Sequence, residues 1–493
     1  MRLDALACAW AEMGTVVLGV KESNMAVRGE LMAFAAVACV ALVGGIAFAG
    51  EGPTHLRPTR SVKFIPGVCT HLGGDRFTPA TLEMLKQSGA MSVRDEIGWI
   101  GVERKQGEMS VPPTHDRYFN STLAAGLDPL LILNYGNPFY DKGDSPRTDE
   151  GRAAFVRYAE FMVNHFKDRL YLYEFWNEWD IAIGGTTPGT ADNYAALLKL
   201  VYPAIKKIDP DILLMAGATT PMAIKNGWLE RMLELGALEF CDAVSIHTYV
   251  YGSKGQAGSP EAWAAWMQQV QEIIHKYSGG KDVPLYVTEH GWPTQIDERG
   301  RTPAVSGEYL ARLYLLARTM PWMKGIWWYD FEDDAMKYDY NEANFGIIRP
   351  DLTPKPSWYA LRDVADLAAN AEYLGREDAG DPDVWVLKFR RPDGRDTWAV
   401  WSAHEDDDWQ VRIQTDPAKR FELTIREVGR EPFRRSWGDK AWYDDKRTWN
   451  ENQVSLIVRG NPWLIEGDLS AGKCAGVAKR EFPEAKRMID AAR

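Results

Sequence analysis

Cysteine is scarce in this chain, which has only five cysteines in 493 residues. They are Cys8, Cys39, Cys69, Cys241 and Cys474. None forms a CxxC pair, and the first two precede the expected start of the mature chain, which leaves an odd number. The chain also lacks an HExxH motif and any clustered set of His and Asp ligands. We therefore expect no structural metal, no other cofactor and no dependence on disulfides.

Glycine-rich phosphate loops and excess positive charge are also missing. Neither GxGxxG nor GxxxxGK[ST] occurs, which argues against a nucleotide-binding fold. The formal net charge is -12, whereas a protein that follows a phosphate backbone needs a basic face. Nucleic acid is therefore excluded as the main partner, and a strongly acidic polysaccharide is disfavoured.

Long hydrophobic runs are limited to one, the uncharged stretch 31–49. Arg28 precedes it, and Ala47-Phe48-Ala49 is an A-x-A cleavage pattern, so a signal peptide cut after Ala49 is predicted. An uncleaved anchor that tethers the protein to a membrane is the alternative, because the run could just span a bilayer. Met25 is a possible true start, which would make residues 1–24 a mis-assigned start. Either reading predicts an exported protein, periplasmic or extracellular.

From about residue 61 to 368, short apolar runs alternate with amphipathic segments of helical period. The runs read as strands of a buried parallel sheet. They are Lys63–Val68, Met91–Asp95, Pro129–Leu133, Tyr171–Trp176, Ile212–Ala216, Ala243–Ile246, Leu285–Thr288 and Gly325–Trp328. Eight strands with helices between them predict an α/β fold, a (β/α)8 TIM barrel over residues 50–368.

The pattern changes after about residue 370. Two strand-like runs, 384–389 and 398–402, flank Pro392-Asp393-Gly394-Arg395, which indicates a hairpin. Further β-rich runs predict a β-sandwich accessory domain over residues 369–470. Residues 471–493 are charged and rich in alanine, and they read as a tail.

Two of the predicted strands run into a glutamate at the end of the barrel where chemistry occurs. Glu178 follows the fourth strand and Glu289 closes the seventh. A carboxylate after an apolar run needs a partner or a function, because burying an unpaired charge is costly. Cleavage of a glycoside needs two such groups, one that protonates the leaving oxygen and one that attacks or activates water. A salt bridge at the barrel rim is the ordinary explanation for either glutamate alone. The two glutamates together are a more specific indication of glycoside cleavage.

These motifs resemble those of the clan A glycoside hydrolases. Trp176-Asn177-Glu178 matches the W-N-E acid/base motif of that clan, and Thr288-Glu289-His290-Gly291-Trp292 matches its T-E-x-G-W nucleophile motif. The segment from Asn344 to Trp358 resembles the stretch that leads to the last barrel helix in that clan. The β-rich C-terminal part resembles family 39, including exopolysaccharide hydrolases of the Psl type. The sequence departs from the clan at Trp179, where proline commonly follows the acid/base.

The resemblance implies a retaining mechanism without a cofactor, with Glu289 as nucleophile and Glu178 as acid/base. It further implies that Arg94 keeps the nucleophile ionised and that Asn177 contacts the sugar 2-hydroxyl. His247 and Tyr249, at the end of the sixth strand, are expected to support the site.

Sugar contacts are the least specific part of the prediction. The candidates at strand ends are Asn134, Trp99, Trp179, Trp292, Trp327 and Trp328. Flat sugar faces pack on flat rings, although core packing is the ordinary role of tryptophan. The predicted partner is an oligo- or polysaccharide, cleaved internally within a secreted bacterial polymer. Two alternatives remain open: a non-catalytic polysaccharide-binding or assembly protein, and a transglycosylase that uses the same site.

Overall fold

The computed structural model describes residues 63–74, 76–416, 422–436, 442–443, 447–450 and 453–480. The predicted export segment 31–49 and its flanking residues lie outside the described residues. Within the described ranges, no helix has the length and apolar character needed to cross a membrane.

The predicted barrel is confirmed: eight parallel strands pair in sequence order and close on themselves. They are β1 (Ile65–Cys69), β2 (Ser92–Glu96), β3 (Asp128–Leu133), β4 (Leu172–Phe175), β5 (Leu213–Thr219), β6 (Ala243–His247), β7 (Leu285–His290) and β8 (Met323–Trp328). Each predicted run overlaps its strand, and their ends differ by a few residues at most. β1 and β8 pair directly, which closes the sheet.

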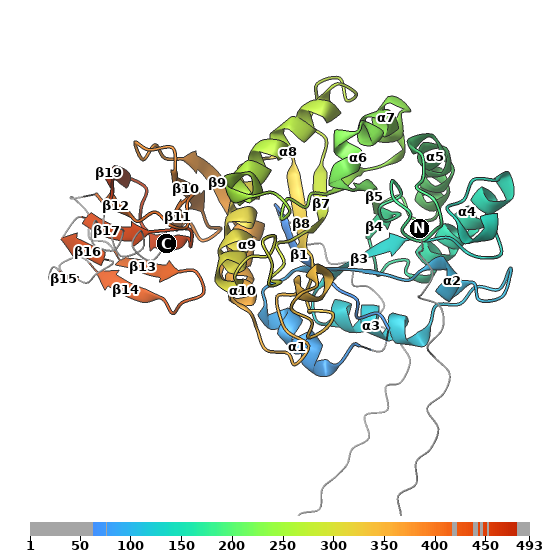
Figure 1. Ribbon diagram of the computed structural model, residues 1–493, viewed down its shortest axis with the longest axis horizontal. Coiled ribbons are helices and arrows are strands. Elements are labelled where there is room, and N and C mark those ends of the chain that lie inside the picture. The colour runs from blue at the N-terminus through green and yellow to red at the C-terminus, as the bar shows by residue number, and fades with distance from the viewer. Residues whose placement is uncertain are drawn as a thin grey trace, which may run out of the picture. The chain divides into compact units, whose positions relative to one another are not determined.

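Helices follow the strands along the chain (Figure 1). They are α1 (Pro79–Gln87), α2 (Trp99–Val102), α3 (Pro113–Ala124), α4 (Asp149–His165), α5 (Ala191–Ile208), α6 (Pro221–Lys225), α7 (Trp228–Glu234), α8 (Pro260–His275), α9 (Pro303–Ala317) and α10 (Pro356–Asn370). A hydroxyl side chain caps the start of several of them. At α1, Thr78 accepts from the backbone of Thr81, and Pro79 occupies the first turn. Such caps satisfy backbone N–H groups that a helix start leaves free, so these residues fix where the helices begin.

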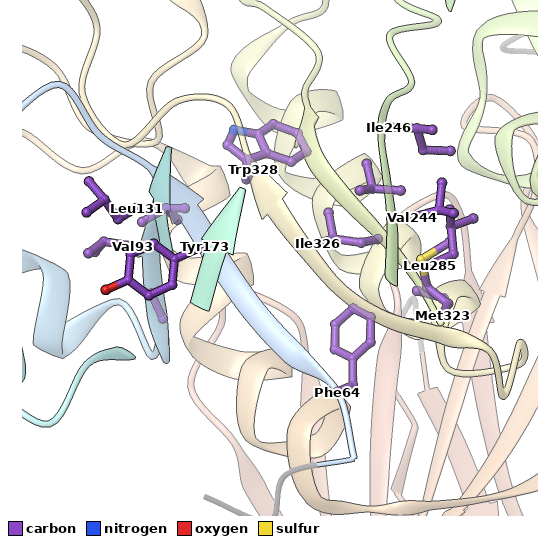
Figure 2. Close-up of a cluster of buried hydrophobic side chains, with 14 of the residues drawn as sticks. Phe64, Val93, Leu131, Tyr173, Val244, Ile246, Leu285, Met323, Ile326 and Trp328 are labelled. Carbon is purple, nitrogen blue, oxygen red and sulfur yellow. The ribbon is translucent and has the colours of Figure 1, made fainter. Parts of the chain in front are cut away.

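The strands bury different side chains on their two faces, because neighbours along a strand point in opposite directions. Apolar residues such as Val93, Leu131 and Ile326 belong to the large core cluster that includes the helices (Figure 2). The alternate positions form a smaller cluster that includes Trp327. The Trp327 indole donates to the Ser92 hydroxyl at 2.9 Å. The smaller cluster points into the barrel, so side chains fill the barrel interior around Trp327.

The C-terminal part forms two antiparallel sheets, as the predicted β-sandwich requires. One has the order β14-β13-β18-β11-β10-β9 and the other β15-β16-β17-β12-β19. The strands are β9 (Glu372–Arg376), β10 (Val384–Arg390), β11 (Asp396–Ser402), β12 (Trp409–Gln414), β13 (Glu422–Glu427), β14 (Phe433–Ser436), β15 (Trp442–Tyr443), β16 (Arg447–Asn450), β17 (Gln453–Val458), β18 (Trp463–Gly467) and β19 (Lys473–Lys479). The predicted hairpin is the β10–β11 pair.

The predicted tail at 471–493 is wrong at its start. Residues 473–479 form β19, which pairs with β12 along its length. Cys474 and Val477 pack against the core of the β-domain. Between the terminal lysines Lys473 and Lys479, the strand holds only alanine and glycine besides these two residues, so it lacks the run of large apolar side chains that indicates a strand.

Gly67 is where the barrel wall has no room for a side chain. A Cβ at this position would lie 2.4 Å from the Trp327 ring. We therefore expect Gly67→Ala to reduce the free energy of unfolding by about 1–3 kcal/mol, the usual cost of overpacking a core. Gly101→Ala is the matched control, since a Cβ there meets nothing within 4 Å. Thermal unfolding of both variants measures the difference, and equal melting temperatures would contradict the account.

Candidate active site

A cavity of about 520 Å³ opens at the carboxyl ends of the barrel strands. Arg94, Asn177, Glu178, Tyr249 and Glu289 all line it. This is the end at which (β/α)8 barrels carry their functional groups. The structure thus brings together residues that are far apart in the sequence.

Glu178 lies on a strained turn directly after β4. Its φ is +48° and that of Trp176 is +68°, which is the left-handed region that side chains larger than glycine rarely adopt. The Glu178 N–H donates to the carbonyl of Ala218, 2.9 Å away, at the end of β5. The neighbouring strand thus holds the turn in place. Strain of this kind is concentrated at functional sites.

The two predicted glutamates face each other. A carboxylate oxygen of Glu178, a ring nitrogen of His247 and a carboxylate oxygen of Glu289 lie within 4.8 Å of one another. Paired carboxyl groups in retaining glycosidases lie about 5–5.5 Å apart, whereas inverting enzymes need about 6.5–9.5 Å to admit a water. The separation fits direct attack by one carboxylate.

Arg94 is the charged centre of the site and is almost fully buried, at 4% exposure. Its guanidinium donates at 2.7 Å to each of three acceptors: Glu289, Glu174 and the amide oxygen of Asn177. Glu174 is itself fully buried inside the barrel. Arg94 therefore fixes the nucleophile candidate and Asn177 relative to each other.

Tyr249 and His247 complete the surroundings of the two glutamates. The Tyr249 hydroxyl donates to Glu289 at 2.8 Å. His247 Nδ1 lies 2.8 Å from Glu178 and 3.5 Å from Glu289. The structure places both side chains, at the end of β6 and in the loop that follows it, in direct contact with the glutamates.

The environments of the two glutamates push their pKa values in opposite directions. Burial works against ionisation of Glu289, but His247, Arg94 and the Tyr249 hydroxyl outweigh it and lower the pKa of Glu289. Burial raises the pKa of Glu178, and the charge of Glu289 adds to this, against the opposing effect of His247. Glu289 therefore ionises first, and Glu178 keeps a proton to higher pH.

His247 shares a hydrogen bond with Glu178, so one proton lies between them. Burial opposes the charged imidazole, but Glu289 and Glu178 outweigh it and raise the pKa of His247. Both partners of this bond therefore have raised pKa values. Without substrate, the Glu178–His247 pair therefore keeps its shared proton to higher pH than either group would alone in water.

The structure contradicts the predicted sugar-stacking role of five tryptophans. Trp99, Trp179, Trp292, Trp327 and Trp328 are each exposed by no more than 1%, and none lines the cavity. Their indole N–H groups donate to protein acceptors, for example Trp292 to the carbonyl of Gly258. These rings are core: Trp328 appears among the buried side chains of Figure 2.

Asn134 is also not at the cavity surface. It is fully buried, and its amide donates to Glu96 at 2.6 Å. Glu96 does line the cavity, so Asn134 holds a residue of the wall instead of contacting a ligand directly.

Several residues that line the cavity were not predicted from the sequence. They are His71, Tyr251, Tyr329, Glu342 and Phe345, with others from the same loops. Most follow β1, β6 or β8, and their position after a strand end was the available signal. Tyr135 accepts from the Asn177 amide at 3.1 Å.

Among the described residues, one group of three side chains is close enough to hold a metal ion: Glu178, His247 and Glu289. These are the same groups that form the hydrogen bonds above. The Arg94 guanidinium, 2.7 Å from Glu289, already supplies positive charge there. That charge opposes a cation, so the donor set fits acid–base and nucleophilic chemistry better than metal binding.

The fold and the site resemble those of clan A glycoside hydrolases, and the solved structures that match the chain are enzymes of this kind. No protein-family model and no curated protein matches the chain. A family 39 glycoside hydrolase from Bacteroides cellulosilyticus WH2 is 25% identical, with a TM-score of 0.66 over 82% of this chain and 81% of that one.

Two further solved structures share the fold. A monomeric β-xylosidase from Caulobacter crescentus CB15 is 19% identical, with a TM-score of 0.59 over 82% of this chain and 96% of that one. A family 39 enzyme from Xanthomonas axonopodis pv. citri is 16% identical, with a TM-score of 0.58 over 82% and 94%. Enzymes of families 51 and 30 are also among the matches. The chain is thus structurally similar to family 39 and to other clan A families.

The opposed pKa shifts predict a bell-shaped pH profile for kcat/KM. With Glu289 as the expected nucleophile and Glu178 as the expected acid, activity would require ionised Glu289, which is lost as the pH falls, and protonated Glu178, which is lost as the pH rises. Tyr249→Phe removes a hydrogen bond that stabilises ionised Glu289. We expect the acidic limb to move up by about one pH unit, given the strength of hydrogen bonds to charged groups.

Tyr338→Phe is the control, because Tyr338 is 48% exposed and its hydroxyl lies 3.9 Å from the Met336 sulfur, away from the two glutamates. The profiles are measured from initial rates on an aryl glycoside. An acidic limb that stays in place in Tyr249→Phe would show that this hydroxyl does not support ionised Glu289.

Proposed function

We propose that this protein is a retaining O-glycoside hydrolase with Glu289 as nucleophile and Glu178 as acid/base. One observation carries the proposal: two carboxyl groups within 4.8 Å of each other line one cavity and have pKa shifts of opposite sign. This arrangement supplies a nucleophile and an acid at the same pH.

In the first step, a Glu289 oxygen attacks the anomeric carbon while the bond to the leaving oxygen breaks. The proton of the Glu178–His247 pair passes through Glu178 to the leaving oxygen, and a glycosyl ester forms on Glu289. Arg94 and Tyr249 lose part of their interaction with Glu289 as its charge falls. They regain it when the ester is cleaved.

In the second step, Glu178 is a carboxylate and takes a proton from water. The water oxygen attacks the anomeric carbon from the opposite face, and the Glu289 ester bond breaks. Two displacements restore the original configuration. Asn177 is held beside Glu289 by Arg94, where its amide can donate to a hydroxyl of the bound sugar.

For the natural substrate, we propose an internal bond of an exported bacterial polysaccharide. The resemblance to exopolysaccharide hydrolases supports the substrate, and the predicted signal at 31–49 supports export to the periplasm or beyond. A cavity that opens to solvent is compatible with a chain that continues past the cleavage point. The length of the products distinguishes internal from terminal cleavage.

Variants of the two glutamates test the roles separately. Glu289→Gln should abolish turnover of every glycoside while it still binds ligand. Glu178→Gln should slow cleavage of poor leaving groups by about 10²–10⁴-fold, the usual contribution of a general acid. An aryl glycoside with a good leaving group should lose much less in its glycosylation step, because that oxygen needs little protonation.

Glu272→Gln is the matched control, an exposed glutamate on α8 outside the cavity. The measurement is a kinetic comparison of 4-nitrophenyl and alkyl glycosides with the wild type and the three variants. If the wild type binds a polysaccharide and cleaves nothing, the non-catalytic alternative is correct. Products longer than the substrate would identify a transglycosylase.

A further inference from the structure

The cavity has two chemically different sides. Around Glu289 the lining is aromatic and polar, with Tyr249, Tyr251, Tyr329 and Glu342. On the loops that follow β4 and β5, beside Glu178, the lining includes Ile181, Ile183 and Pro221, together with Thr220. We call the group Ile181, Ile183 and Pro221 the aliphatic wall.

The loops that carry the aliphatic wall are fixed to the acid/base residue. The Ile181 N–H donates to the Glu178 carbonyl at 3.1 Å. Asp180 accepts from the Thr220 N–H at 3.1 Å and from the Thr220 hydroxyl at 2.5 Å. This link joins the β4 and β5 loops. The aliphatic wall therefore keeps a set position relative to Glu178.

The Thr220 hydroxyl, the polar group beside the aliphatic wall, already has protein hydrogen-bond partners. Besides its bond to Asp180, the Thr220 hydroxyl accepts from the Ala223 N–H at 3.2 Å, as the cap of α6. Ile181 and Ile183, in contrast, are 36% and 40% exposed. Isoleucine at this exposure gains free energy when a ligand removes it from water.

The reaction determines which part of a substrate meets this wall. Glu178 protonates the leaving oxygen, so the group attached to that oxygen lies next to the residues that flank Glu178. We propose that this leaving group presents an apolar surface to the aliphatic wall: an alkyl or aryl aglycone, or a methyl-bearing (deoxy) sugar. The proposal rests on the function proposed above and specifies its leaving-group preference.

The test uses n-alkyl glycosides from methyl to hexyl, in the β-D-xyloside and β-D-glucoside series. Leaving-group basicity hardly changes along each series, so differences report contact with the chain. We expect kcat/KM to rise about two- to fourfold per methylene, up to the full effect of a buried CH₂. Dissociation constants for the Glu289→Gln protein should fall in parallel, and these need no turnover.

The paired variant Ile181→Thr/Ile183→Thr replaces the two exposed side chains of the aliphatic wall with polar ones of similar shape. It should flatten the dependence of kcat/KM on chain length. Ile296→Thr is the matched control, because Ile296 is 78% exposed on the loop after β7 and does not line the cavity. Its dependence on chain length should equal that of the wild type.

A second arm separates the possible sources of the apolar surface. Disaccharides that release glucose are compared with those that release 6-deoxyglucose, which differ only by one hydroxyl. A preference for the deoxy unit that disappears in the paired variant identifies a methyl-bearing sugar. Preference for alkyl chains alone identifies an aglycone that is not a sugar.

The outcomes also separate this proposal from the proposed function. Equal affinity of the Glu289→Gln protein for methyl and hexyl glycosides would overturn the apolar leaving-group site, whatever the activity. Tighter binding of hexyl glycosides without turnover in the wild type would instead retain the site and contradict the hydrolase function.

Discussion

The buried guanidinium of Arg94 determines the arrangement of the whole site. Removing an arginine from water costs several kcal/mol unless strong acceptors replace the lost hydration. Here two carboxylates and an amide do so, each at 2.7 Å. The acceptors are Glu174 on β4, Asn177 on the turn that follows β4, and Glu289 on β7. These elements must therefore place their side chains at the same level along the barrel axis as Arg94 on β2. Glu174 has no assigned chemical step, but it helps to compensate the charge that holds Glu289.

The difference between the two glutamates follows from this arrangement. Glu289 receives hydrogen bonds from Arg94 and Tyr249 and stays ionised, whereas Glu178 is turned away from Arg94 and bonds His247 instead. The left-handed backbone at Trp176 and Glu178 orients the acid/base toward the cavity. Local strain of about 1–3 kcal/mol per residue is tolerable here because the bond to Ala218 and the Arg94–Asn177 contact hold the turn on both sides.

Much of this structure could be predicted from the sequence, because it depends on local patterns. Short apolar runs that end in polar residues predicted the eight strands. Strand ends converge in any such barrel, which brings Glu178, Glu289 and Arg94 together, whereas their roles were expected from the resemblance to clan A. The β-domain was predicted by its hairpin and its alternating runs. Its last strand was missed because only Cys474 and Val477 pack inward, and the rest of the strand is alanine, glycine and terminal lysines.

The surface of the cavity could not be predicted in the same way. A tryptophan at a strand end reads equally well as a sugar platform or as core, and the packing of the complete barrel decides between them. Trp327 fills the space above Gly67, and Trp328 faces Trp292 on the other side of the sheet. The cavity is instead lined by Tyr251, Glu342 and the aliphatic wall. These lie on loops whose paths depend on distant contacts such as Asp180 with Thr220.

The most direct test of the account is the anomeric configuration of the first product released by the wild type, followed by proton NMR before mutarotation. Two carboxyl groups at this separation, one ionised and one protonated, predict that the product has the configuration of the substrate. A product of inverted configuration would mean that Glu289 activates water instead of forming an ester, and it would contradict the double-displacement mechanism.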